Sequence, residues 1–280
     1  VNAEHDGKTG VITISRESYN SDVDSELNRA IDWLKGEGIQ NVIVTGDFHF
    51  ATQMVGADTN EFFPALENED EGYRIANTWS ITARRLHNEF KVSVGYINGK
   101  RCMGGFLELM VHCHYLVTTD SVKLGMPEVT LPVVPGMEGC HWLFRKANKE
   151  DWPKLMKLLL NGNQVKASDT VGWLCDYTGT EEQALAMTWK LANGEANSLS
   201  LRKVAENAVT GIPTDLQLTA PDNAGMEAAR KAIMATIVDA CNASLSDALS
   251  IQSRHSGNFM TTNYCKRGMV GTAFNQVMNV

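Results

Sequence analysis

Short apolar runs rich in β-branched residues alternate with segments whose apolar side chains recur at helical spacing, and this alternation constrains the fold most strongly. The expected strands are residues 11–14, 41–46, 92–97 and 115–119, and the expected helices between them are residues 24–35, 70–90 and 105–113. Strands separated by helices favour an α/β fold with crossover connections.

The pattern changes after residue 178, where no further strand is expected. Residues 181–193, 198–210 and 223–256 are helical by their apolar period. We therefore expect the chemistry to lie before residue 180, and the helical region to shape a pocket or an oligomer interface.

Composition excludes several classes of protein. The 280 residues are 43% hydrophobic and 21% charged, which is ordinary for a globular chain with a sizeable core and excludes whole-chain disorder, collagen and coiled coil. The 25 Lys and Arg against 33 Asp and Glu give a net charge of −8 without any basic run, so nucleic acid is not an expected partner. The six cysteines form no C-x-x-C pair and are expected to be reduced, buried thiols.

Membrane and export signals are also missing from the pattern. No apolar stretch approaches the ~18 residues of a membrane span, and residues 1–10 lack the apolar run of a signal peptide. We expect a cytoplasmic protein with no membrane partner.

A glycine pair marks the most informative segment. Gly104 and Gly105 open the helical pattern at residues 105–113, and Glu108 follows one turn later among apolar neighbours. Free backbone N–H groups at the positive end of a helix stabilise a developing oxyanion. A second carboxylate, Glu128, follows Pro127 twenty residues after Glu108.

The order of these elements resembles the crotonase (enoyl-CoA hydratase/isomerase) superfamily. Its members carry an A-G-A-D element, an N-G…G-G-G-x-E-L element and a P-E followed by P-G, which are similar to residues 55–58, 98–109, 127–128 and 135–136. Residues 159–176 resemble the family's next stretch. The resemblance implies a spiral of ββα units with the acyl-CoA site over residues 1–195, then a helical oligomerisation region over residues 196–280, assembled as a homotrimer or hexamer.

The resemblance also implies roles for individual residues. The N–H groups of Ala57 and Gly105 would form an oxyanion hole for a thioester carbonyl, and Glu108 and Glu128 would be the acid and base. The residues expected to contact coenzyme A are Arg16, Gly56, Asp58 and Gly104. No metal or redox cofactor is implied, because coenzyme A belongs to the substrate.

The implied reaction is hydration of a 2-enoyl-CoA, in which Glu108 takes a proton from water and a protonated Glu128 delivers one to the α-carbon. Double-bond isomerisation, another crotonase-type lysis or hydrolysis, and non-catalytic acyl-CoA binding within a larger protein remain as alternatives. The acyl chain is left open.

Several residues carry competing interpretations. Glu108 could be a solvated helix glutamate, and Glu128 a loop carboxylate. Asp58 stands three residues before Glu61, which is capping-box spacing and predicts a helix N-cap. His141 could act as an acid or base in the pocket. His112 and His114 favour helix-end packing over a metal site, because residues two apart do not share a helix face.

Two departures from the family pattern bear on the site. Met103 and Phe106 stand where the family usually has glycine, which makes the wall of the site bulkier. The segment around Arg16 lacks the proline of the family's N-R-P element, so the contact with coenzyme A departs from the family pattern at this point.

Overall fold

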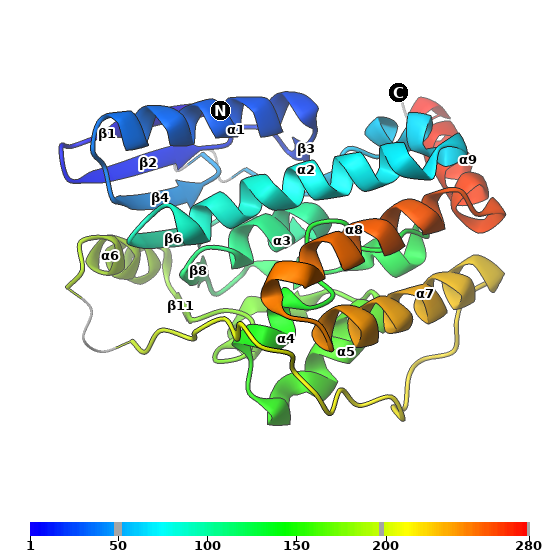
Figure 1. Ribbon diagram of the computed structural model, residues 1–280. Helices are drawn as coiled ribbons and strands as arrows, with labels where there is room; N and C mark the ends of the chain where they lie inside the picture. The colour runs from blue at the N-terminus through cyan, green and yellow to red at the C-terminus, as the bar shows by residue number, and fades with distance from the viewer. Residues whose placement is uncertain (48–51, 196–198, 279–280) are drawn as a thin grey trace. The chain divides into compact units, whose positions relative to one another are not determined.

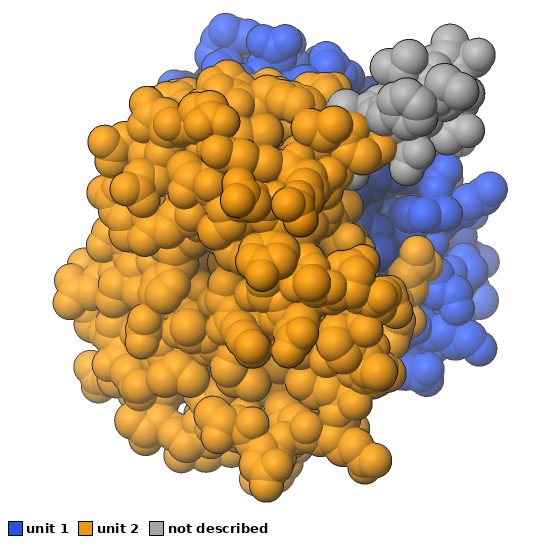
Figure 2. Space-filling view, turned by 90° about the vertical axis from the view of Figure 1, so that its right-hand side faces the viewer, with its two compact units in different colours: residues 1–57, 81–124, 165–203 blue, residues 58–80, 125–164, 204–280 orange. Residues whose placement is uncertain are grey.

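The computed structural model describes residues 1–47, 52–195 and 199–278, and its contacts divide the chain into two compact units (Figure 2). Unit 1 consists of Val1–Ala57, Ile81–Leu124 and Val165–Lys203, and unit 2 consists of Asp58–Ser80, Gly125–Gln164 and Val204–Val280. The expected boundary between residues 195 and 196 borders residues outside the described ranges and stays a prediction.

A mostly parallel sheet forms the centre of unit 1 (Figure 1). Among the described residues its strand order is β1 (Asn2–His5), β2 (Thr9–Thr13), β4 (Asn41–Thr45), β6 (Val92–Ile97), β8 (Tyr115–Thr119) and β11 (Tyr177–Gly179). Only the β1–β2 pair is antiparallel within this sheet. The predicted α/β class with crossover connections is confirmed.

Three helices make the crossovers that the sequence pattern predicts. They are α1 (Ser21–Gly36), α2 (Glu69–Asn88, whose second half belongs to unit 1) and α3 (Gly104–Val111). A Cβ atom on Gly10 would lie 2.8 Å from Leu34 of α1, and one on Gly95 would lie 3.2 Å from the Met110 carbonyl oxygen of α3. These close contacts place α1 and α3 against the sheet.

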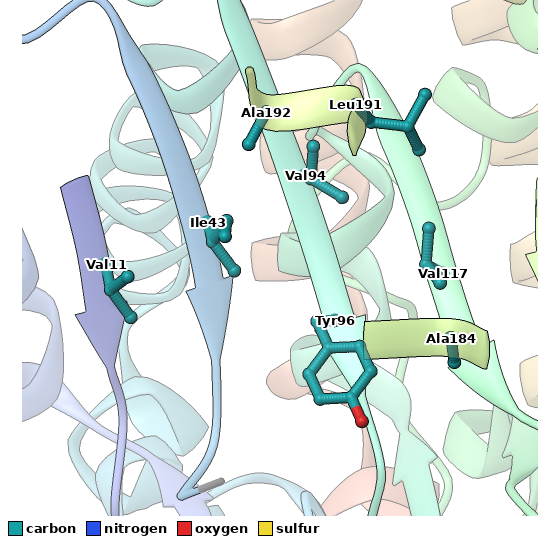
Figure 3. Packing of buried hydrophobic residues seen from close by; sticks show 8 residues of the cluster. All are labelled: Val11, Ile43, Val94, Tyr96, Val117, Ala184, Leu191 and Ala192. Atoms are coloured by element: carbon teal, nitrogen blue, oxygen red, sulfur yellow. The ribbon is translucent and has the colours of Figure 1, made fainter. Parts of the chain in front are cut away.

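The other sheet face is covered by α6 (Glu181–Ala192). Figure 3 shows the core between them, made by Val11, Ile43, Val94, Tyr96 and Val117 of the strands and Ala184, Leu191 and Ala192 of the helix. Because alternate strand residues point to opposite faces, a sheet covered on both sides needs the near-continuous apolar runs that this sequence contains.

Short strands beside the main sheet were not predicted. β3 (Ser18–Tyr19) pairs with β5 (Gly56–Ala57), and β7 (Arg101–Met103), β9 (Lys123–Gly125) and β10 (Val165–Lys166) form a small sheet. Strands of two or three residues carry no usable periodicity, although they place the candidate site.

Unit 2 is mainly helical. Its elements are η1 (Thr59–Glu67), the first half of α2, η2 (Pro127–Thr130), α4 (Trp142–Lys146), η3 (Lys149–Asp151), α5 (Trp152–Asn161), α7 (Ala224–Cys241), α8 (Leu245–Met260) and α9 (Asn263–Met278). The single helix expected over residues 223–256 is two, because Asn242 ends α7 and the Ser244 side chain caps α8 by accepting from the Asp247 N–H.

The helix expected over residues 198–210 is wrong, since residues 199–223 contain neither helix nor strand. Backbone groups in this segment bond to distant partners instead of to each other. The Arg145 guanidinium donates to the carbonyl oxygens of Ala205 and Asn207, and the Val209 N–H donates to Cys241. Tertiary hydrogen bonds of this kind override a weak helical period.

All six cysteines are buried and none forms a disulfide in the described structure, as predicted. No helix in the described ranges is long and apolar enough to cross a membrane.

Helices α2 and α8 pack closely within unit 2, so we expect one methyl group added at Gly257 to lower the stability of the protein strongly. A Cβ on Gly257 would lie 2.6 Å from both the Glu69 carbonyl oxygen and the Tyr73 nitrogen, which are backbone atoms that cannot rotate away. We expect Gly257→Ala to lower the free energy of unfolding by about 3 kcal/mol, measured by urea unfolding.

Gly36→Ala is the matched control, because no described atom lies within 4 Å of its added Cβ. The control should gain up to about 1 kcal/mol from helix propensity. Equal stability of the two variants would contradict the close helix packing.

Candidate active site

Strand β5 and the residues just before it are held by backbone hydrogen bonds within unit 1. It pairs in parallel with β3, with Ser18 opposite Gly56 and Tyr19 opposite Ala57. Two residues before β5, the Met54 N–H donates to the Arg101 carbonyl at 3.1 Å and the Met103 N–H donates to the Met54 carbonyl at 2.9 Å. The segment that leads into Ala57 therefore runs beside the segment that leads into α3.

Gly56 brings these two segments into close contact. Its φ angle is +116°, which side chains rarely adopt. A Cβ at this position would lie 3.2 Å from the Met103 carbonyl oxygen and 3.8 Å from the Gly105 nitrogen. The structure thus brings Ala57 and Gly105, the two predicted oxyanion donors, onto adjoining backbones of one unit.

The start of α3 leaves backbone donors available. Met103 is the N-cap residue, and within the described structure its side chain makes no capping hydrogen bond. Gly104 has a φ angle of +53° and, like Gly105, carries no side chain that could screen the first turn. The first N–H groups of a helix lack intrahelical partners and favour negative charge.

Glu108 lies in the same short helix and is only 2% exposed. Every residue of α3 is buried, so the alternative of a solvated helix glutamate is wrong. The Glu108 carbonyl oxygen lies 2.6 Å from the Nδ1 atom of His112. His114 contacts the Ser93 N–H through its own Nδ1 at 2.9 Å, so both histidines take part in packing around α3 and β6.

Glu128 belongs to unit 2, on the 3₁₀ turn η2, and is 7% exposed. Its Oε2 atom is buried without a hydrogen-bond partner among the described residues. Burial raises the pKa of the Glu128 carboxyl from 4.5 to about 8, because a charge there loses its hydration. The raised pKa favours the protonated form of this carboxyl near neutral pH. Its role as an acid, rather than as a plain loop carboxylate, stays a prediction.

The loop after Glu128 is fastened by three side chains of unit 2. Ser256 and Gln252 of α8 donate to the carbonyls of Val134 and Pro135, at 3.2 and 2.7 Å, and Ser80 of α2 donates to Gly136 at 2.9 Å. Fixed carbonyls on consecutive residues make this loop rigid.

His141 follows that loop and is fully buried. The Arg145 Nε–H donates to its Nδ1 at 2.9 Å, so the ring proton resides on Nε2, which lies 3.0 Å from Glu138 Oε1. Because both ring nitrogens are occupied, His141 bridges a carboxylate and a guanidinium and offers no nitrogen for proton transfer to a substrate.

Of the four residues expected to contact coenzyme A, three belong to unit 1 and one belongs to unit 2. Gly56 and Gly104 belong to the backbone around the candidate oxyanion hole, and Arg16 is exposed in unit 1. Asp58 starts unit 2 and caps η1, since its Oδ1 accepts from the Asn60 N–H at 3.0 Å. The predicted N-cap is confirmed.

The sequence pattern missed two residues behind the site. Tyr19 pairs with Ala57, and its hydroxyl donates to Asp24 of α1 at 2.5 Å. Tyr19 is singled out by its pairing with Ala57, and Asp24 by its hydrogen bond to Tyr19.

The chain is similar in sequence to a known protein family and to individual proteins. A model of the family described as enoyl-CoA hydratase/isomerase matches residues 15–266. A probable enoyl-CoA hydratase of Bacillus subtilis is 26% identical over 204 residues, covering 70% of this chain and 76% of the relative. A probable mitochondrial enoyl-CoA hydratase of Dictyostelium discoideum is 29% identical over 220 residues, covering 73% of this chain and 74% of the relative.

Solved structures are similar over nearly the whole chain. The crystal structure of a carnitinyl-CoA dehydratase from Mycobacterium thermoresistibile matches with a TM-score of 0.72 at 16% identity, over 98% of this chain and 89% of that one. That of an enoyl-CoA hydratase from Bacillus halodurans matches with a TM-score of 0.69 at 14% identity, over 96% and 98%. At these identities the likeness shows the fold.

The raised pKa of Glu128 predicts a pH-dependent stability. Below about pH 4.5 the folded and unfolded chains both carry this proton, and between about 4.5 and 8 only the folded chain retains it. Stability therefore falls as the pH rises through this window. In urea unfolding, the wild type should lose stability relative to Glu128→Gln between about pH 5 and 8. Parallel stability curves would contradict a protonated Glu128.

Proposed function

The chain belongs to the enoyl-CoA hydratase/isomerase family, and from this premise we propose that it adds water across the 2,3 double bond of a 2-enoyl-CoA, giving a 3-hydroxyacyl-CoA. It has the crotonase fold, an α/β core with helices toward the C-terminus. The observation that carries the proposal is the buried Glu128 carboxyl, whose Oε2 has no partner among the described residues and whose pKa is raised by burial.

Ala57 and Gly105 would bind the thioester oxygen through their N–H groups. Addition to the double bond drives negative charge onto that oxygen, in an enolate-like transition state. Donors fixed in advance stabilise such charge without reorganising, and one of them is typically worth about 3 kcal/mol. The close approach at Gly56 and the first turn of α3 supports this role.

Glu108 and Glu128 would divide the proton transfers. Glu108 would accept a proton from the water that attacks the β-carbon, and Glu128 would donate its own proton to the α-carbon. In each turnover Glu108 gains one proton and Glu128 loses one, so the two carboxyls together carry an unchanged number of protons. Proton exchange then restores the starting state. The proposed reaction uses coenzyme A as part of its substrate and needs no separate cofactor.

A second acid distinguishes hydration from its nearest alternative. Isomerisation of a double bond shuttles one proton and requires a single carboxylate, whereas hydration requires both a base and an acid. The pKa of about 8 for Glu128 supplies an acid near neutral pH, which favours hydration. Assembly as a homotrimer or hexamer stays a prediction.

The first test measures loss of the conjugated enoyl-thioester absorbance with short, medium and aromatic 2-enoyl-CoAs. We expect Glu108→Gln and Glu128→Gln each to lower kcat by at least roughly a hundredfold on the best substrate, because each removes one proton transfer. Product analysis by mass should show a gain of one water.

Glu206→Gln is the control for these variants, since Glu206 is exposed and its resolved hydrogen bond uses only its backbone carbonyl. A shifted double bond without added water would identify an isomerase. Binding of acyl-CoA without turnover of any substrate would contradict the proposed hydration and indicate a binding module.

The pH dependence of kcat/KM offers an independent prediction. The free enzyme needs Glu128 in its protonated form, and that form is lost as the pH rises through about 8. We expect kcat/KM to fall about tenfold per pH unit above this value. A profile that stays level to about pH 9.5 would exclude Glu128 as the acid.

A further inference from the structure

We propose that Tyr19, anchored by Asp24, is a positioning residue that holds the Ala57 N–H in register with the first turn of α3. The inference rests on the proposed oxyanion hole but not on the hydration step. All the contacts that support it lie within unit 1.

The first contact is through the backbone. Tyr19 is the parallel partner of Ala57, and β3 is the strand that pairs with β5 in their two-stranded sheet. The preceding Val55 N–H donates to the Glu17 carbonyl at 2.8 Å, which extends the same pairing. A displacement of Tyr19 therefore displaces Ala57.

The second contact is through the ring. The Tyr19 ring meets the Phe106 ring edge-on, with centroids 5.6 Å apart and planes at 87°. Both side chains are fully buried, and Phe106 directly follows Gly105 in the first turn of α3. Tyr19 thus contacts the elements of both donors. Its ring touches α3, which carries Gly105, and its backbone pairs with Ala57.

The third contact locks the ring in place. The Tyr19 hydroxyl donates to Asp24 Oδ1 at 2.5 Å, and Asp24 is 5% exposed. Asn28 and Thr82 surround the same carboxyl, with Asn28 Nδ2 3.5 Å from Asp24 Oδ2 and 2.8 Å from Thr82 Oγ1. Burial raises the pKa of both the phenol and the Asp24 carboxyl.

A polar pair at this depth carries a desolvation cost that a leucine or phenylalanine would avoid. In exchange, the hydrogen bond to Asp24 fixes the direction in which the ring points, and full burial keeps its edge-on contact with Phe106. Phe106, which stands where the family usually has glycine, is the surface that this orientation meets. Tyr19 and Phe106 therefore form one contact between the elements that carry the two donors.

The test separates positioning from general stability. Tyr19→Phe keeps the ring but removes the hydroxyl that donates to Asp24, and Asp24→Ala removes the acceptor of the same hydrogen bond. Asp24→Asn keeps an acceptor for the Tyr19 hydroxyl. Thr188→Val is the matched control, since it removes one buried hydroxyl, bonded to the Ala184 carbonyl, from α6.

One readout needs no turnover. Butyryl-CoA labelled with ¹³C at its carbonyl has no double bond to hydrate, and its carbonyl stretch moves to lower frequency when N–H groups bind the oxygen. We expect Tyr19→Phe and Asp24→Ala to lose roughly half of the wild-type shift or more, with Asp24→Asn and Thr188→Val retaining it.

The second readout is the kinetics on the best 2-enoyl-CoA. Tyr19→Phe and Asp24→Ala should lower kcat roughly tenfold with KM within about twofold, because misaligned donors weaken transition-state binding. Asp24→Asn should recover most of the rate.

An unchanged carbonyl shift in Tyr19→Phe would overturn the inference, as would an equal loss in Thr188→Val. A wild-type protein that binds butyryl-CoA without any shift would also overturn it, because no oxyanion hole would exist to be positioned. A wild-type shift that depends on Tyr19, without hydration of any substrate, would support the inference while contradicting the proposed reaction.

Discussion

The close approach of two backbones, at Gly56 and at the start of α3, is the contact on which the candidate site depends. Two N–H groups can bind one oxygen only when their chains lie nearly in contact, and a Cβ at Gly56 would press against the Met103 carbonyl at 3.2 Å. Strands β3 and β7 hold that approach from either side. The sheet of unit 1, covered by helices on both faces, keeps those short strands in place.

Burial gives Glu128 its proposed chemistry. An ionised carboxylate without hydrogen bonds is costly in a dry environment, so Glu128 keeps its proton to a pH of about 8. The loop that follows is tied by Ser80, Gln252 and Ser256, which limits how far the acid can relax toward water. The same principle explains why Asp24 needs Tyr19, Asn28 and Thr82 around it.

Prediction from the sequence succeeded where a signal repeats along the chain. The main strands are short apolar runs rich in β-branched residues, and the crossover helices follow an apolar period of about 3.6 residues. Accordingly, α1, α3 and β6 lie within a few residues of their expected bounds. The roles of Glu108 and Glu128 rest on the order of motifs and stay predictions. Strands β3, β5 and β7 were missed, because two or three residues are too few to show a period.

What the sequence determined by itself is local: the alternation of strands and helices, the glycines that permit close approach, and caps such as Asp58. These depend on φ angles and on hydrogen bonds between residues that are near in the chain. The tertiary structure alone decided the burial that raises the pKa of Glu128, the contact between Tyr19 and Phe106, and the course of residues 199–223 without helix or strand. Those features depend on desolvation and on partners such as Arg145 that are distant in sequence, and such partners meet only once the chain has packed.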